Sequence, residues 1–167
     1  MGTGIQGKIS EFYYNQYPNR TNLIVTQVED FTSGWEAQLF RYVVEYQEKK
    51  QTVREERVIR LYHGNQAVEK ATKEYNILNR LHSEGFPVPK VFHVESDIHA
   101  LGGPFIIMEL IKGRDLSEVL NEISSDESEK LILRFHKTWV DLHNLEVSKI
   151  FPETPKGDTV MYMMNYS

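Results

Sequence analysis

Arg60 and Glu74 are the two residues whose types and spacing point most clearly to chemistry. Arg60 lies between the apolar residues 58–59 and 61–62, and a cation in such surroundings calls for an anionic partner. Glu74 lies in a helical pattern at residues 66–84 and falls at about 240° on its helical wheel, inside the apolar arc and alone among charged residues there. Because a buried carboxylate needs a partner and an arginine pairs well with it, we expect the two side chains to meet.

This pair has two interpretations. It could be an ion pair that only fastens a helix to a sheet, or the glutamate could hold the arginine where it reaches a phosphate group. In the run 57–62, alternation places Arg60 on the same face as Val58 and Tyr62.

Five strands and one main helix are predicted to position these residues. Strand-like patterns occupy residues 23–28, 37–46, 53–62, 91–94 and 105–109, and short turns join the first three into an antiparallel meander. The helix at 66–84 has Asn65 as its expected N-cap and Gly85 as its end. Its apolar positions are Val68, Ala71, Tyr75, Leu78 and Leu81. The predicted fold is therefore α+β, a five-stranded antiparallel sheet with one main packed helix.

Further helices are predicted at both ends of the chain. Residues 8–17 form a short aromatic-rich helix, and residues 101–104 form a turn. A short helix starts at Asp115, with Asp115 as its cap and Glu118 at the capping-box position. A longer helix runs to about residue 145. Its apolar stripe consists of Ile132, Phe135, Trp139 and Leu142.

Composition excludes several classes of function. The 167 residues are 40% hydrophobic, which supports a globular core, and the net charge of −5 argues against a nucleic-acid or anionic-membrane partner. The chain has no cysteine, so disulfides, thiolate metal sites and a cysteine nucleophile are excluded. The histidines show no metal-ligand spacing, and we expect no metal site. With no apolar run long enough to cross a bilayer and no signal peptide, we expect a cytoplasmic protein.

The order of these segments resembles a known family. The segments are Val58-Ile59-Arg60, Lys73 to Leu78 around Glu74, Val88-Pro89-Lys90-Val91, Met108-Glu109 followed by Gly113, and Trp139 to Leu145. Over roughly residues 28–145 the chain resembles the aminoglycoside phosphotransferase family, which is similar in fold to protein kinases and choline kinases. Residues 1–111 would then be a nucleotide-binding N-terminal lobe with its N-terminal helix. Residues 112–167 would be the hinge exit and the first helices of an incomplete C-terminal lobe.

The resemblance implies a nucleotide site. Arg60 would contact phosphate with Glu74 as its helix partner, and Val58 and Met108 would line the adenine pocket. Glu109, Leu110 and Ile111 would form the hinge that hydrogen-bonds the adenine edge. Ser33 and Gly34 would form the turn over the phosphates, although one glycine is fewer than the glycine-rich run of the protein kinases.

No catalytic residue is assigned. In the resembled family a His-Gly-Asp loop and a later acidic residue supply the chemistry. The segment most similar to this loop is Lys156-Gly157-Asp158 with Asn165. It differs from the family's loop in residue type and in spacing, and we interpret it as a chance match. We therefore expect the N-terminal part of an ATP-dependent phosphotransferase for a small-molecule hydroxyl, truncated before its catalytic loop and inactive alone. ATP or GTP with Mg²⁺ would serve the full-length protein, and folding of this chain would need neither.

Two other interpretations of the chain stay open. The chain could be a non-catalytic kinase-like binding or regulatory module, or an unrelated α+β domain if Arg60 and Glu74 lie far apart. The acceptor stays open among aminoglycosides, choline, other amino alcohols and sugars. The stripe on the last long helix would pack against the rest of a complete C-terminal lobe, so we expect it to be exposed here and to cause self-association.

Overall fold

A computed structural model describes residues 4–31 and 37–146. The chain divides into two compact units, Met1–Ile111 and Lys112–Ser167. The first unit contains the sheet, and the described residues of the second include the helices α4 and α5. Each unit is described by itself.

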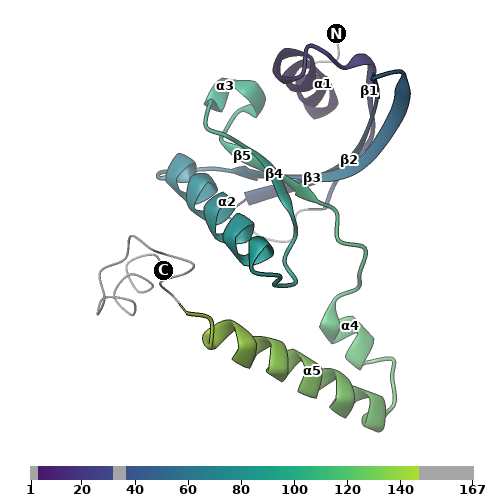
Figure 1. Cartoon of the computed structure of the whole chain (residues 1–167), viewed down its shortest axis with the longest axis vertical. Helices are drawn as coiled ribbons and strands as arrows, with labels where there is room; N and C mark the ends of the chain where they lie inside the picture. The colour runs from purple at the N-terminus through teal and green to yellow at the C-terminus, as the bar shows by residue number, and fades with distance from the viewer. Residues whose placement is uncertain (1–3, 32–36, 147–167) are drawn as a thin grey trace. The chain divides into compact units, whose positions relative to one another are not determined.

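A single five-stranded sheet forms the centre of the first unit (Figure 1). Its strands are β1 (Thr21–Asp30), β2 (Ala37–Glu48), β3 (Gln51–Tyr62), β4 (Val91–Glu95) and β5 (Phe105–Glu109). Their order is β1-β2-β3-β5-β4, and every neighbouring pair is antiparallel. The expected α+β fold with a five-stranded antiparallel sheet is confirmed, and β1 to β3 form the expected meander.

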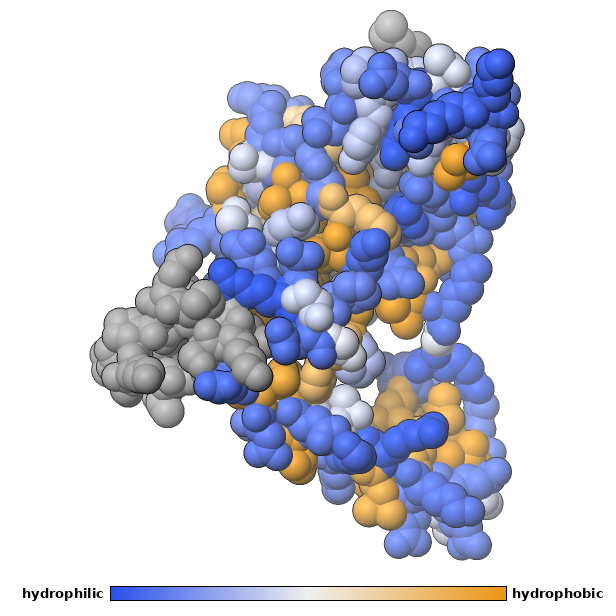
Figure 2. Space-filling model, viewed as in Figure 1, coloured by the Kyte–Doolittle hydropathy of each residue, from blue (hydrophilic) through white to orange (hydrophobic). Residues whose placement is uncertain are grey.

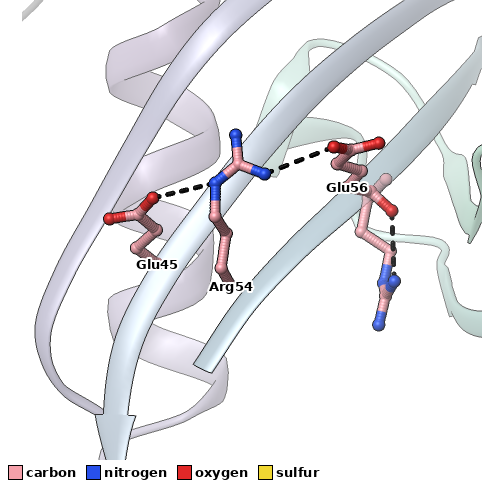
Figure 3. A network of polar contacts seen from close by, with 4 residues as sticks. Glu45, Arg54 and Glu56 are labelled. Carbon is pink, nitrogen blue, oxygen red and sulfur yellow. Dashed lines mark hydrogen bonds and ion pairs between the residues drawn. The ribbon is translucent and has the colours of Figure 1, made fainter. Parts of the chain in front are cut away.

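A tight turn joins β2 to β3 with no register shift. The strands pair residue by residue from Ala37 opposite Tyr62 to Glu48 opposite Gln51, so the turn consists of Lys49 and Lys50. Both lysines have positive φ, at 51° and 65°. Near this end of the hairpin, Arg54 lies between two carboxylates, with Nε 3.0 Å from Glu45 and Nη1 3.2 Å from Glu56 (Figure 3).

Helix α1 (Ile5–Gln16) covers one face of the sheet. It begins and ends slightly earlier than the predicted helix at residues 8–17. Its buried side chains Ile9, Phe12 and Tyr13 pack with Ile59 and Leu61 of β3, among other core residues. The Tyr13 and Tyr42 hydroxyls share a hydrogen bond of 2.8 Å inside this core. Because Ile59 and Leu61 face α1, the alternate residues of β3 must face the other way.

Helix α2 (Ala67–Ser83) covers that other face. Ala67 and Ala71 pack against Tyr62 of β3 and Ile106 of β5. The expectation that Val68 is buried is wrong, since 43% of it is exposed. The buried centre of the helix lies between Ala67 and Ala71, about 80° around the helix from Val68.

The start of α2 also differs from the prediction. The N-cap is Gln66, in the left-handed region at φ 65°, and no side chain caps the helix. Asn65 lies one position too early, because the turn continues through Gln66 before helical geometry begins. The end is as expected, since Gly85 adopts a left-handed φ of 80°, which glycine tolerates.

A short helix, α3 (Ile98–Leu101), precedes β5 and was not predicted. The predicted turn at 101–104 follows it, with Gly102 at φ 97°. At the next residue, Gly103, a Cβ atom would lie only 2.6 Å from the Tyr62 carbonyl oxygen. The Tyr62 N–H donates to the Pro104 carbonyl at 2.9 Å, so the loop lies directly against the end of β3.

The second unit contains α4 (Leu116–Leu120) and α5 (Ser125–His143). Asp115 caps α4 as predicted, accepting from the Ser117 N–H at 2.8 Å. The reciprocal capping box is found instead at the start of α5, between Ser124 and Glu127. Ile132, Phe135 and Trp139 of the predicted stripe are exposed as expected, and Leu142 is half-buried. Within residues 4–31 and 37–146, no helix is both long and apolar enough to cross a membrane.

Candidate functional site

Arg60 and Glu74 meet between β3 and α2. Arg60 Nε lies 3.5 Å from Glu74 Oε2, and the two side chains are 34% and 30% exposed. The predicted pairing is therefore confirmed. The pair is only partly buried, so solvent screens it and the guanidinium stays within reach of a ligand.

Two buried donors at this pair make no hydrogen bond of ordinary geometry in the described part of the chain. They are Arg60 Nε and the hydroxyl of Tyr62. Tyr62 is 4% exposed, and the Arg60 guanidinium carbon lies 5.6 Å from its ring centre. Burial, followed by the charge of Glu74, raises the pKa of Tyr62 well above its usual range. A phenol in these surroundings stays protonated, and it can act as a donor.

Val58 and Met108 form an apolar surface beside the pair. They lie directly opposite each other on β3 and β5, and Arg60 lies opposite Ile106 two residues further on. Val58 is buried and Met108 is half-buried. Since residues two apart on a strand share a face, Val58, Arg60, Ile106 and Met108 lie on the α2 face. The structure thus brings four of the predicted site residues together: Val58, Arg60, Glu74 and Met108.

The predicted hinge follows directly from Met108. Glu109 is the last residue of β5, and its N–H donates to the Lys90 carbonyl at 2.8 Å. Its carboxylate in turn accepts from the Lys90 N–H at 3.2 Å. The Glu109 N–H is therefore occupied, whereas Leu110 and the exposed Ile111 lie beyond the end of the strand.

Several predicted positions lie outside the described residues. These are Ser33 and Gly34, proposed for the phosphate turn, and Lys156 to Asp158 with Asn165, interpreted as a chance match.

Sequence reasoning missed Arg41 of β2. This residue lies directly opposite Val58, and its Nε donates to Glu29 Oε2 of β1 at 3.0 Å. Because Arg41 pairs with Val58, its side chain lies on the same face of the sheet as Val58 and Arg60, and it is about half exposed. Alternation along 37–46 was enough to place Arg41 and Ala37 on one face, but the register with Val58 required the hairpin turn to be known.

A shallow pocket of about 300 Å³ lies elsewhere in the first unit. Tyr62 lines it together with the start of α2 and the Gly102–Pro104 loop, whereas Arg60, Glu74 and Met108 do not. Among residues 4–31 and 37–146, no cluster of three His, Asp or Glu side chains could hold a metal ion.

Comparison with known proteins decides the family. The model of the phosphotransferase enzyme family, APH, matches residues 27–160, more than half of the chain. The chain belongs to this family. The predicted resemblance is confirmed, and the interpretation as an unrelated α+β domain is wrong.

Two curated relatives share a shorter segment. Acyl-CoA dehydrogenase family member 11 of Pongo abelii is 32% identical over 79 residues, which is 47% of this chain and 10% of the relative. The protein of the same name in Gallus gallus is 30% identical over 82 residues, 48% of this chain and 10% of the relative. The chain thus matches about a tenth of the length of these relatives.

One solved structure is also similar. It is a protein of Ralstonia eutropha described as an aminoglycoside phosphotransferase, with 23% identity and a TM-score of 0.43. The match covers 65% of this chain and 28% of that protein.

Proposed function

We propose that residues up to Ile111 bind the nucleotide of an ATP-dependent phosphotransferase that acts on a hydroxyl group of a small molecule. The observation that carries this proposal is the Arg60–Glu74 pair, which holds a cation between sheet and helix beside an apolar surface. The family supports phosphoryl transfer as the reaction. Because the donor would be a nucleoside triphosphate, we propose that the protein acts in the cytoplasm.

The residues at this site fit a nucleotide. The guanidinium of Arg60 is a planar fork that suits phosphate oxygens, and because its Nε faces Glu74 the terminal nitrogens are left for them. Val58 and Met108 offer an apolar surface to adenine, and the backbone of Leu110 and Ile111 lies where the edge of the base would be recognised. Mg²⁺, when bound, would neutralise charge on the phosphates. We assign no described residue as its ligand or as the catalytic base.

The name of the curated relatives does not extend to this chain. The match covers only about a tenth of the length of each relative. We therefore propose no dehydrogenase chemistry here, and the acceptor stays open among aminoglycosides, choline, other amino alcohols and sugars.

Nucleotide titrations followed by NMR test the proposal, since this method detects weak binding. We expect ATP to shift signals of β3, α2 and the 109–111 segment. Arg60→Ala should weaken ATP binding about 10- to 100-fold, because hydrogen bonds to charged groups are worth about 1.5–3 kcal/mol. Binding of adenosine, which has no phosphate, should change little.

Arg54→Ala is the matched control. Arg54 lies on the same strand at the same alternation and is also paired with carboxylates, but it lies six residues from Arg60 toward the hairpin turn. ATP binding that is absent, or that falls equally in both variants, would contradict a phosphate site at Arg60. Absent binding would favour the alternative of a non-catalytic kinase-like binding or regulatory module.

A further inference from the structure

Tyr62 is placed to act on the Arg60–Glu74 pair. It follows Arg60 by two residues on β3, so both side chains lie on the face that α2 covers. Tyr62 is 4% exposed and packs in the cluster of Ala67 and Ala71 from α2. Its ring centre lies 5.6 Å from the guanidinium carbon of Arg60.

The Tyr62 hydroxyl is buried without an ordinary hydrogen bond, which is unusual for a tyrosine. Buried phenols normally find a partner, because an unpaired buried donor is unfavourable. The only other donor at this pair in the same state is Arg60 Nε, among the residues that the structure describes. Neither donor makes a hydrogen bond of ordinary geometry, although the Glu74 carboxylate lies 3.5 Å from Arg60 Nε.

Glu74 is the acceptor that the charges indicate for the hydroxyl as well. After burial, the charge of the Glu74 carboxylate and then a hydrogen bond to it raise the pKa of Tyr62, so the hydroxyl lies close to this carboxylate although the bond falls short of ordinary geometry. A carboxylate has two oxygens and accepts several hydrogen bonds, so it can serve both donors at once.

We propose that Tyr62 is a positioning residue of the nucleotide site: its hydroxyl donates to Glu74 and holds this carboxylate against Nε of Arg60. The terminal nitrogens of the guanidinium are then left for phosphate oxygens. The role in nucleotide binding rests on the proposed function, whereas the contact between Tyr62 and Glu74 does not depend on it.

A double-mutant cycle without nucleotide tests the contact. Tyr62→Phe removes only the hydroxyl, and Glu74→Ala removes the acceptor. We expect Tyr62→Phe to increase the unfolding equilibrium constant about five-fold when Glu74 is present and to have no such effect beside Glu74→Ala. An equal effect in both backgrounds would overturn the inference, whatever the protein binds.

Titrations with ATP and adenosine test the positioning role. Tyr62→Phe should weaken ATP binding about five-fold, leave adenosine binding unchanged, and add no further loss beside Glu74→Ala. Tyr75→Phe, at a half-buried tyrosine of α2 in the same cluster, is the control and should change neither ligand.

The outcomes separate the two proposals. If Arg60→Ala weakens ATP binding and Tyr62→Phe does not, the positioning role is overturned and the nucleotide site stands. If the unmodified chain binds no ATP, the proposed function fails and the positioning role fails with it. The cycle then still reports whether the hydroxyl pairs with Glu74.

Discussion

At the scale of the residue, the choice of arginine at position 60 matters. A lysine carries its charge at a single point, whereas the guanidinium of Arg60 has donors on Nε and on two terminal nitrogens. Nε faces Glu74, and so the other nitrogens can address a second anion. Because the pair is about a third exposed, it contributes little to stability, and its value lies in orienting the arginine.

Two tyrosines buried between α1 and the sheet, Tyr13 and Tyr42, make the stability of the fold sensitive to alkaline pH. Burial raises the pKa of Tyr13 to about 12, and burial also raises that of Tyr42 well above its usual value. An unfolded tyrosine loses its proton near pH 10. The stabilisation is therefore complete below pH 10 and is lost as pH rises toward 12. We expect Tyr13 alone to lower the free energy of unfolding by about 2 kcal/mol over this range in denaturant titrations, and Tyr42 to add to this loss.

The double variant Tyr13→Phe with Tyr42→Phe tests the assignment. It removes both hydroxyls of the 2.8 Å hydrogen bond and leaves neither unpaired, so the alkaline loss should become smaller. Tyr14→Phe, at a half-exposed tyrosine of the same helix, should leave it in place. An unchanged loss in the double variant would contradict the assignment.

Single residues were predictable where one periodicity decides the outcome. Alternation along β3 and the helical wheel of α2 were enough to place Arg60 opposite Glu74. The same wheel failed for Val68, since it gives the apolar arc but not which part of the arc is centred on the sheet. The state of the Tyr62 hydroxyl depends on packing between two elements, and no sequence pattern contains that information.

At the scale of the element, the β2–β3 turn is the clearest strained feature. Hairpins with two-residue turns favour positive φ at both central positions, which usually selects Asn-Gly. Here both positions are lysines, at φ 51° and 65°. Left-handed geometry costs a residue with a Cβ atom about 1–2 kcal/mol. The turn therefore sets the register of β3 at some cost in stability.

Lys50→Gly should relieve part of this cost. Glycine adopts positive φ freely but loses more entropy on folding, so we expect the free energy of unfolding to rise by about 0.5–1 kcal/mol. Chemical denaturation measures it. Lys50→Ala keeps a Cβ atom and should give no such gain, and equal stability of the glycine and alanine variants would show that φ is not the cause.

Strands were easier to predict than helix ends. The five strands have β-branched or alternating patterns between turn residues, and all five are present. The cap of α2 was misplaced by one residue, because the backbone turn through Gln66 leaves no signal in residue type. The capping box of α5 at Ser124 and Glu127 has the standard spacing, which is the signal in the sequence that could have located the start of this helix.

At the scale of the whole molecule, the second unit differs from the first in how it covers apolar residues. The sheet unit buries a core on both faces. No residue of α5 is buried, and five of its large apolar residues are 38–59% exposed. They are Ile132, Leu133, Phe135, Trp139 and Val140. Figure 2 shows hydrophobic side chains at the surface of this part of the chain.

We expect the chain to self-associate through this face of α5. An exposed apolar surface of this kind is typical of an interaction site. Light scattering or sedimentation should give an apparent mass that rises above that of the monomer with concentration. Trp139→Glu places a charge in the stripe and should restore the monomer.

Lys130→Gln is the control for this prediction. It changes the net charge by the same amount, but Lys130 lies about 160° around α5 from Ile132, and association should persist. Monomers at high concentration in the unmodified chain would contradict the prediction. The sequence predicted the stripe because a period of 3.6 residues is clear over a long helix.

Gly103 carries a consequence for how mutational data on this protein should be read. With the Tyr62 carbonyl 2.6 Å from where a Cβ would lie, any side chain at 103 must displace backbone at the end of β3. A saturation library would therefore retain almost nothing but glycine there. If positions are ranked only by how many substitutions they tolerate, this buried loop position would score like an active-site residue. The reason for its intolerance is steric, because no side chain fits there. The activity of each variant should therefore be divided by the amount of folded protein before functional residues are assigned from such a scan.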